Sequence, residues 1–350
     1  MRRVSVLDAR ALLALITLAG CSASGIGPGE LAQPPIAVLY WDRQAARDRS
    51  EAETELERPN RLGVADVGDL GRMLGLRGDE ARAVAHRYPG HLSLVDPATG
   101  AIQRVEAAPP GAVPLAWSPD RSALLLAAPG RRGSVQLHEY WVVAEELRPV
   151  TTGPLAHARG DYGPDGRLAV VADRGDGWSR VELTASGEGA RRVAFEGPPV
   201  YDVRWSPRGD RLLLAVVDPA RRERGGRGAR MLFALSPQAP LQTWPPGADS
   251  KLESLGRGRD PVFNADGEWI VYSARIGGGW RLRRMRAEGG GRLPIGRGVR
   301  DEIEPAVSPD GSLVAYVALE GGLHRLFIRR IDGSGDRLLL PDGAFARPVW

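Results

Sequence analysis

A short turn motif recurs through most of this 350-residue chain at nearly regular intervals. Its versions include WSPD, GPDG, WSPRGD and SPDG, and each precedes a short apolar run bounded by turn residues, as expected of strands. The aligned turn positions, spaced by 45, 43, 58 and 44 residues, are Asp120, Asp165, Arg208, Asp266 and Asp310. A strand-rich repeat of this length predicts a β-propeller built from four-stranded blades.

The recurring proline, aspartate and glycine of the motif have a structural explanation. Proline fixes φ in a turn, aspartate accepts hydrogen bonds from nearby backbone amides, and glycine adopts positive φ. We therefore interpret Asp120, Asp165, Asp266 and Asp310 as turn residues rather than as catalytic acids.

The terminal segments complete the count of blades. Five full units begin near Pro114, Arg159, Asp202, Asp260 and Glu304. Before them, PPIAVLYWD (34–42) matches a second strand and HLSLVDPATGAIQRV (91–105) matches a third and a fourth, whereas the C-terminal ARPVW matches the missing innermost strand. Because unpaired strand edges promote aggregation, we expect the two termini to share a sixth blade, and we expect that the chain is not truncated there.

These motifs resemble the repeat of TolB-type β-propellers over roughly residues 90–350. The resemblance implies an all-β fold, a six-bladed β-propeller of four-stranded blades, and it is specific for the fold rather than for an activity. TolB itself carries an α/β domain before its propeller, for which this chain has no room. We therefore carry the partners of TolB over only as an analogy.

Two segments depart from the repeat. The 58-residue unit contains an insertion around 219–230. The larger insertion, 43–88, lies between the second and third strands of the shared blade, and Val67, Leu70, Met73 and Leu74 fall on one helical face. We expect two or three short helices laid over one face of the propeller. This insertion is either a binding element or a mobile surface segment.

The N-terminus predicts export and lipidation. Arg2 and Arg3 precede the apolar run ALLALITLA (11–19), which is too short to span a bilayer but fits the core of an export signal. The run ends in LAGC, which resembles the bacterial lipobox and implies that Cys21 becomes the lipidated N-terminus. The alternative is an ordinary signal peptide or a buried first helix. We divide the chain into a signal peptide (1–20), a linker from Cys21 (21–33) and the propeller (34–350), with the insertion 43–88.

The predicted lipid site has consequences for redox state and location. Cys21 is the only cysteine, so a lipidated mature chain has neither a free thiol nor a disulfide. The resemblance implies several acyl chains, which give stable anchoring where one chain does not. It also implies that Ser22, being other than Asp, permits transfer to the outer membrane, where the protein would face the periplasm.

The charge of the chain argues against nucleic acid as a partner. There are 47 Lys and Arg against 43 Asp and Glu, and removal of residues 1–20 takes away three Arg and one Asp, leaving 44 against 42. Both signs are interspersed, so there is no broad field for a polyanion. The basic stretch RRERGGRGAR (221–230) is an exception, which we interpret as a solvated loop.

The sequence offers no motif for catalysis. Its five histidines fall in different repeat units or in the insertion: His86, His91, His138, His157 and His324. None of them forms an H-x-H or H-E-x-x-H pair, and no G-x-S-x-G elbow is present. The glycine clusters lie in expected hairpin turns, not between a strand and a helix where phosphate would bind. We predict a non-enzymatic protein with no metal and no cofactor.

One set of charged residues recurs at the same repeat position, three residues before each Trp equivalent. With Pro114 as the uncharged sixth member, this ring consists of Arg159, Asp202, Asp260, Glu304 and Arg347. Because the innermost strands of a propeller line its channel, we expect these side chains to gather at one mouth. They either stabilise the channel through salt bridges or bind a cation or a peptide terminus.

Together these features predict an exported, membrane-anchored lipoprotein that binds or scaffolds an envelope protein or peptide. The alternative is a propeller enzyme, either a polysaccharide lyase or a hydrolase, that uses the channel face. A structural lipoprotein without a ligand is the third hypothesis. Channel-facing histidines beside acids would favour the enzyme, and the scattered histidines argue against it.

Overall fold

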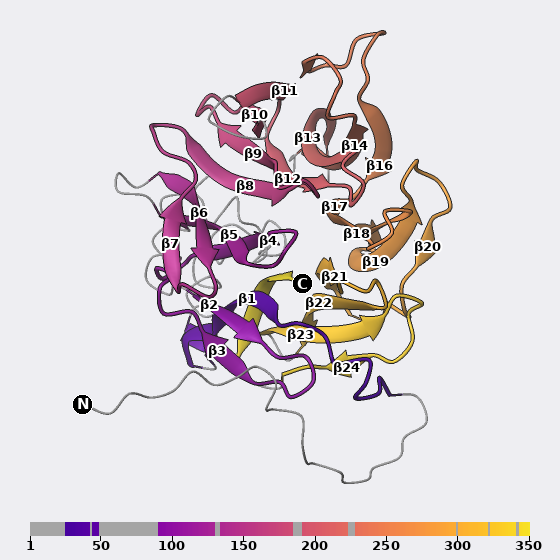
Figure 1. Ribbon diagram of the computed structural model, residues 1–350. Coiled ribbons are helices and arrows are strands. Elements are labelled where there is room, and N and C mark those ends of the chain that lie inside the picture. The colour runs from indigo at the N-terminus through magenta and orange to yellow at the C-terminus, as the bar shows by residue number, and fades with distance from the viewer. Residues whose placement is uncertain are drawn as a thin grey trace, which may run out of the picture.

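The computed structural model describes residues 25–42, 44–48, 90–129, 134–184, 191–222, 228–298, 300–320, 323–340 and 343–350. Their strands form six sheets arranged like blades around a common axis (Figure 1). The prediction of an all-β, six-bladed propeller of four-stranded blades is therefore confirmed. Within the described residues, no helix is long and apolar enough to cross a membrane.

The first three blades follow the expected order, with the innermost strand first. Blade 1 contains β4 (Val113–Trp117), β5 (Ala123–Pro129), β6 (Val135–Trp141) and β7 (Glu146–Pro149). Blade 2 contains β8 (Ala156–Tyr162), β9 (Leu168–Asp173), β10 (Ser179–Thr184) and β11 (Arg191–Gly197). Blade 3 contains β12 (Val200–Trp205), β13 (Leu212–Arg222), β14 (Gly228–Leu235) and β16 (Glu253–Arg257).

The remaining blades keep this order, and the last one joins the two ends of the chain. Blade 4 contains β17 (Arg259–Phe263), β18 (Trp269–Ile276), β19 (Gly279–Arg286) and β20 (Leu293–Pro294). Blade 5 contains β21 (Glu302–Val307), β22 (Leu313–Glu320), β23 (Leu323–Arg330) and β24 (Arg337–Leu338). Blade 6 contains β25 (Ala344–Val349), β1 (Ile36–Trp41), β2 (His91–Val95) and β3 (Ile102–Arg104).

The pairing of β25 with β1 confirms the predicted closure of the ring. The strands are antiparallel, with Phe345 opposite Tyr40 and Ala344 opposite Trp41. The Phe345 and Tyr40 rings lie 5.2 Å apart between centroids. The indole Nε1 of Trp350 donates a hydrogen bond to the carbonyl oxygen of Pro34 at 2.9 Å. The C-terminal strand is thus bound to the N-terminal segment by backbone, ring and indole contacts.

The apolar core lies between neighbouring blades rather than at the axis. On β13, Leu212 and Leu214 pack in the cluster shared with blade 2, whereas Leu213 and Ala215 pack in the cluster shared with blade 4. Successive side chains of a strand point to opposite faces. The run RLLLAVVD is therefore apolar without alternation because both faces of its strand are buried.

The turn aspartates have the structural role predicted for them. The Oδ1 atom of Asp120 accepts hydrogen bonds from the Ser122 N–H at 3.0 Å and the Ser118 hydroxyl at 2.7 Å. In blade 5, Asp310 Oδ1 accepts from the Ser312 N–H at 3.0 Å and the Ser308 hydroxyl at 2.6 Å. The bond from Ser122 N–H is the largest effect that lowers the pKa of Asp120.

The innermost strands begin at one face of the propeller and end at the other, which we call the start face and the end face. The larger insertion leaves from the start face, since β1 ends at Trp41, opposite the beginning of β25 at Ala344. Residues 44–48 are helical, and Ala46 is buried beside Leu39 and Val113. The predicted helices around Val67 to Leu74 lie outside the described residues.

The 58-residue unit departs from the repeat in two ways. Strands β13 and β14 extend the hairpin that contains the predicted insertion 219–230. The connection after β14 contains β15 (Gln242–Thr243), which pairs in parallel with β11 and adds a fifth strand to blade 2. The extra length therefore ties blade 3 to the outer edge of its neighbour.

Part of the predicted linker is held against the propeller. Residues Ile26 and Leu31 are buried in the core cluster of blades 5 and 6. Glu30 forms an ion pair with Arg330 of blade 5, with 2.6 Å between Oε2 and Nε. Contacts with the propeller therefore begin before residue 34, where we expected the domain to start.

Candidate binding site

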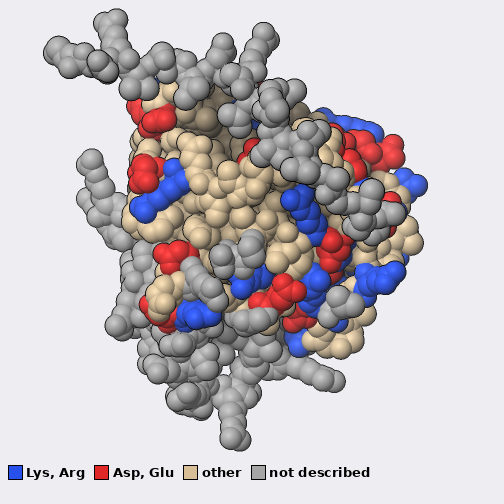
Figure 2. Space-filling model, turned by 90° about the horizontal axis from the view of Figure 1, so that it is seen from below, with Lys and Arg blue, Asp and Glu red and all other residues tan. Residues whose placement is uncertain are grey.

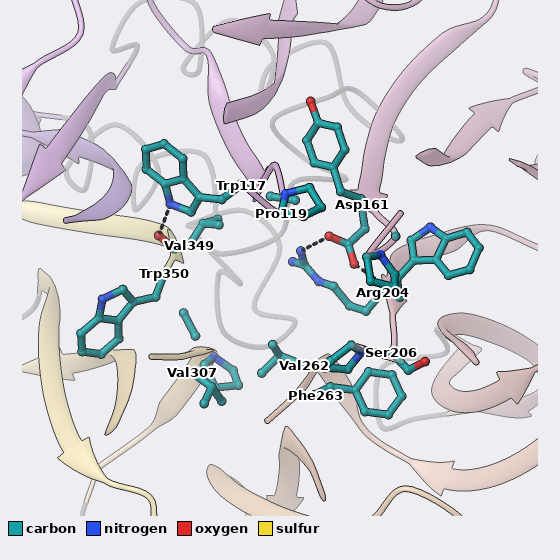
Figure 3. Close-up of a pocket in the computed structure, with 18 of the residues that line it drawn as sticks. Trp117, Pro119, Asp161, Arg204, Ser206, Val262, Phe263, Val307, Val349 and Trp350 are labelled. Atoms are coloured by element: carbon teal, nitrogen blue, oxygen red, sulfur yellow. Dashed lines mark hydrogen bonds and ion pairs between the residues drawn. The ribbon is translucent and has the colours of Figure 1, made fainter. Parts of the chain in front are cut away.

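The end face carries a pocket of about 350 Å³ at the centre of the propeller. The ends of all six innermost strands line it (Figure 3). Aromatic and proline side chains make up most of its wall: Trp117, Pro119, Tyr162, Pro164, Trp205, Pro207, Phe263, Pro305, Pro348 and Trp350. Val262, Val307 and Val349 add aliphatic surface. The pocket is thus a depression with a mixed, somewhat more apolar than polar lining, and no single blade forms it alone.

Residues of the turn motif form part of this pocket wall in addition to forming the turn. Its Trp equivalent closes the innermost strand, and its proline follows just after, as in Trp117 and Pro119. An aromatic residue occupies the Trp position in every blade except the fifth, where Val307 stands. The sequence analysis interpreted the motif only as a turn and did not predict the pocket. The aromatic residue that recurs at the Trp position was the feature that could have indicated it.

Direct contacts fix the Trp117 side of the wall. The indole Nε1 of Trp117 donates to the carbonyl oxygen of Val349 at 3.3 Å, across the boundary between blades 1 and 6. The guanidinium of Arg121 lies 4.5 Å from the centroid of the Trp117 ring, in cation–π contact. The ring therefore has a defined position before any ligand binds.

One ion pair interrupts the apolar lining. Arg204 and Asp161 point into the pocket, with 4.0 Å between Nη1 and Oδ1 (Figure 3). Nη1 of Arg204 also donates to the carbonyl oxygen of Leu115 at 2.6 Å, and its Nε lies 3.3 Å from Oδ1 of Asp202. This Nε atom is buried and makes no hydrogen bond among the described residues. We call Asp161, Asp202 and Arg204 the open cluster.

The carboxyl group of Asp161 is strongly affected by its surroundings. Burial raises its pKa to about 7, against the opposing effects of Arg204 and of a hydrogen bond from the Trp205 N–H. That hydrogen bond, to Oδ2, measures 2.7 Å. A carboxyl group with a pKa near neutrality changes its charge over an ordinary range of pH. The sequence did not single out Asp161, because it lies one residue before the Trp equivalent, where the other blades carry no recurring acid.

Three members of the predicted ring form a second, buried group in blades 4, 5 and 6. Arg347 Nε lies 3.4 Å from Oε1 of Glu304, and Arg347 Nη1 lies 3.8 Å from Oδ1 of Asp260. Arg259 adds a hydrogen bond from Nε to Oδ2 of Asp260 at 2.8 Å. The side chains of Asp260 and Glu304 are 8% and 2% exposed. We call Arg259, Asp260, Glu304 and Arg347 the closed cluster.

The backbone places these residues by a repeated local distortion. Asp260, Glu304 and Arg347 have φ values of 51°, 54° and 54°, in the left-handed region that non-glycine residues rarely adopt. Glu304 Oε2 accepts a hydrogen bond from the Arg347 N–H at 2.7 Å, and Asp260 Oδ2 accepts from the Glu304 N–H at 3.4 Å. Each carboxylate thus bonds to the innermost strand of the next blade.

The electrostatics of the closed cluster follow from burial and from the two arginines. Burial raises the pKa of Glu304, although Arg347 opposes this effect. Burial also acts to raise the pKa of Asp260, but Arg259 and Arg347 outweigh it and hold that pKa below its ordinary value. These contacts are the ones required if the ring stabilises the channel.

Arg159 and Asp202 each make a contact outside the closed cluster, although the charge of Asp202 also acts to raise the pKa of Arg347. Arg159 donates from Nε to the carbonyl oxygen of Tyr201 at 2.5 Å, and Asp202 belongs to the open cluster. Pro114 pairs with Leu126 within blade 1. The structure therefore brings three of the five charged ring members together, and a binding role for Arg159, Asp202, Asp260, Glu304 and Arg347 stays a prediction.

The described histidines belong to no candidate metal site. No group of three or more His, Cys, Asp or Glu side chains among the described residues is placed to hold a metal ion. His157 is buried in blade 2, and burial lowers its pKa. His86 lies outside the described residues.

Basic and acidic side chains alternate over the surface that Figure 2 views, without a large region of one sign.

Known proteins match this chain over most of its length in fold, but over only 26% of its length in sequence. No family model matches the chain. Two proteins named Tol-Pal system protein TolB, from Anaeromyxobacter dehalogenans strains 2CP-C and 2CP-1, are 33% and 32% identical to it over 91 residues. This stretch is 26% of the chain, which spans only 21% of the length of each relative.

Solved structures resemble the chain over most of its length. TolB from Acinetobacter baumannii matches with a TM-score of 0.62 at 15% identity, covering 91% of this chain and 66% of that one. A putative TolB from Agrobacterium tumefaciens matches with a TM-score of 0.55 at 21% identity, covering 70% and 86%. The tricorn protease matches with a TM-score of 0.51 at 13% identity, covering 72% and 24%. At these identities the likeness concerns architecture, and the chain has the fold of a TolB-like β-propeller.

Proposed function

We propose that this chain is a lipid-anchored cell-envelope protein that binds a segment of another protein in the end-face pocket and catalyses no reaction. The observation that carries the proposal is the pocket itself, which all six blades line with aromatic, proline and aliphatic side chains. Concave, mostly apolar sites with a few polar groups are typical of ligand binding. The resemblance to TolB, which is named as part of the Tol-Pal system, favours an envelope protein as the partner.

The pocket also defines the chemistry of its ligand. Trp117, Pro119 and Val262 offer apolar surface for an aliphatic or aromatic side chain, whereas Phe263 and Trp350 are buried in the core between blades. The guanidinium of Arg204, which lines the pocket, can donate to a carbonyl or carboxylate oxygen, and its charge strengthens such a hydrogen bond. The ligand that fits both features is an apolar peptide segment with an exposed backbone carbonyl or a C-terminal carboxylate.

The location follows from the N-terminal prediction. We propose that the chain is exported, that Cys21 carries the lipids, and that the protein faces the periplasm from the outer membrane. Cys21 lies outside the described residues, so its lipidation is testable only by chemistry. Labelled palmitate should enter the wild-type protein and not the Cys21→Ala variant.

Capture from detergent-solubilised envelopes tests the binding role. The intact lipoprotein is compared with Val262→Trp, in which a larger side chain fills the pocket, and with Val143→Trp at an exposed turn 97% accessible to solvent. We expect Val262→Trp to reduce capture of one defined partner by about tenfold or more, the equivalent of about 1.4 kcal/mol. Val143→Trp should capture as the wild type does. Equal capture by all three proteins, with equal thermal midpoints, would contradict the proposal.

Catalysis is tested separately with purified protein. We expect no turnover of peptide, ester or glycan substrates. Turnover that disappears in Asp161→Asn or Arg204→Gln would overturn the non-enzymatic assignment, because both residues face the pocket. Charge reversal at Asp202 or Glu304 that changed capture without a loss of stability would show a binding role for the ring.

A further inference from the structure

Residues 25–35 form a strap across the end face, and its outer half is fixed on blade 5. Glu30 accepts two hydrogen bonds from Arg330, at 2.6 Å from Nε and 2.8 Å from Nη2. Arg330 Nη2 also donates to the carbonyl oxygen of Gly25 at 3.1 Å. Ile26 and Leu31 are only 8% and 2% exposed. Polar contacts and buried apolar side chains therefore hold the strap from Gly25 onward.

The inner half of the strap reaches the edge of the pocket. Gln33 donates from Nε2 to Oδ2 of Asp310 at 2.6 Å, in the turn that follows β21. Trp350, which lines the pocket, donates to Pro34. Arg121 of blade 1 donates from Nη2 to the carbonyl oxygen of Pro35 at 3.2 Å. Figure 1 shows this indigo segment beside β24 and leading into β1.

The strap lies on the same face as the pocket. Arg330 ends β23, which runs in the direction of β21, and it pairs with Leu313 just after the turn at Asp310. The pocket is lined by Val307, at the end of β21. The outer end of the strap and the pocket mouth therefore both belong to the end face.

The position of Gly25 limits where a lipid on Cys21 can lie. Four residues of extended chain span at most about 14 Å. We propose that the strap presents the end face, with its pocket, to the surface of the phospholipid leaflet that holds the acyl chains. This inference rests on the proposed lipidation of Cys21, and it adds an orientation that lipidation alone does not give.

The orientation separates two surfaces of the propeller. The start face, at which β1 ends with Trp41, would point away from the membrane. A pocket ligand would have to approach along the leaflet, as a segment of a protein close to the membrane surface does. Around the end face, Arg121 and Arg330 alternate with Asp310 and Glu145, so the tether rather than net charge sets this orientation.

Energy transfer between the protein and the membrane measures the orientation. Single cysteines replace Val143, in the turn between β6 and β7 on the end face, or Leu319, near the end of β22 on the start face. Both positions are exposed, and with Cys21 lipidated the introduced cysteine is the only free thiol. Each thiol carries a donor dye, and the lipoprotein is reconstituted in phosphatidylethanolamine and phosphatidylglycerol vesicles that contain an acceptor-labelled lipid.

We expect transfer from Val143→Cys to exceed transfer from Leu319→Cys by about twofold or more, since a six-residue strand separates the faces by about 20 Å. Equal transfer, or stronger transfer from Leu319→Cys, in a protein held on the vesicles through Cys21 would overturn the orientation alone. Failure of the wild-type protein to bind, or equal binding by Cys21→Ala, would overturn the proposed lipid anchor and the orientation with it.

Two changes test whether the strap causes the orientation. Glu30→Ala combined with Leu31→Ala should reduce the difference between the labels, whereas Glu146→Ala, which breaks an exposed ion pair on blade 1, should not. An insertion of about 20 Gly and Ser residues between Ser24 and Gly25 adds roughly 25 Å of flexible reach while leaving the strap contacts in place. It should lower transfer and abolish the difference. A difference that persists in both proteins would show that another contact orients the propeller.

Discussion

The same propeller contains two groups of charged side chains that differ in their access to solvent. The closed cluster of blades 4 to 6 buries Asp260 and Glu304 between Arg259 and Arg347. The open cluster of blades 2 and 3 places Asp161 and Arg204 at the wall of the pocket, where Arg204 remains 20% exposed. The first group has its charges matched in the interior, whereas the second includes two charged side chains that line the pocket.

The comparison shows that an equivalent repeat position does not fix a residue's role. Asp202 and Asp260 both stand three residues before the end of their innermost strands. Asp260 contacts two arginines in the interior, and Asp202 contacts Arg204 beside the pocket. The neighbouring blade, rather than burial or the position in the motif, decides which partners such a charge meets, since the side chains of Asp202 and Asp260 are 6% and 8% exposed.

The largest effect is expected from removal of the strand that carries Arg347. Deletion of 345–350 removes most of β25, breaks the closed cluster and exposes the edge of β1. We expect aggregation or a fall in the thermal midpoint far beyond that of Trp350→Ala, which alone should cost about 3–5 kcal/mol of unfolding free energy. A soluble deletion variant with the midpoint of the wild type would contradict the role of β25 in closing the ring.

A matched pair of substitutions compares the clusters directly. Arg347→Ala leaves Asp260 and Glu304 without their shared cation and should lower the free energy of unfolding by about 3–5 kcal/mol. Arg204→Ala should cost only about 1–2 kcal/mol, because Asp161 takes up a proton and the pocket admits water. Urea unfolding measures both values. Equal losses would show that the two clusters do not differ in the way their surroundings indicate.

The open cluster should also make the unfolding free energy of the protein depend on pH. The pKa of Asp161 is about 7 in the folded protein against an ordinary value of 3.8, so the folded state holds a proton that the unfolded chain has released between these values. Its contribution to stability is therefore fully present below pH 3.8 and is lost as pH rises through about 7.

The Asp161→Asn variant isolates this effect. Between pH 5.5 and 7, the unfolding free energy of the wild type should fall by about 2 kcal/mol relative to that of the variant. Urea unfolding at several pH values, with equal ionic strength, gives the difference. A constant difference over this range would mean that the carboxyl group of Asp161 is not buried as described.

The smallest effect on stability is expected at the predicted anchor. Cys21→Ala should leave the unfolding free energy of the propeller within about 0.5 kcal/mol of the wild type, as for substitutions away from packed features. It should nevertheless move the protein from the membrane fraction to the soluble fraction. Retention of the variant in the membrane would contradict lipidation, and a large loss of stability would show that Cys21 packs against the propeller.

The sequence by itself determined the propeller, its six blades and the shared terminal blade. These features depend on local chemistry that repeats along the chain: proline and glycine in turns, aspartates such as Asp120 that bond to the next amides, and short apolar runs. The strand order of blade 6 then follows, because the N-terminal unit lacks an innermost strand and the C-terminal strand supplies it. The turn spacing also predicted a structural role for the turn aspartates, which their hydrogen bonds to turn amides confirm.

Only the tertiary structure decided which charged side chains meet and which line a site. Several features join segments from different repeat units: the open and closed clusters, the pocket, the pairing of β15 with β11, and the strap from Gly25. Their formation depends on distances between blades and on how much solvent each side chain retains. A repeat pattern contains neither quantity, because it records the position of a residue within its own blade and not the side chains that the next blade places beside it.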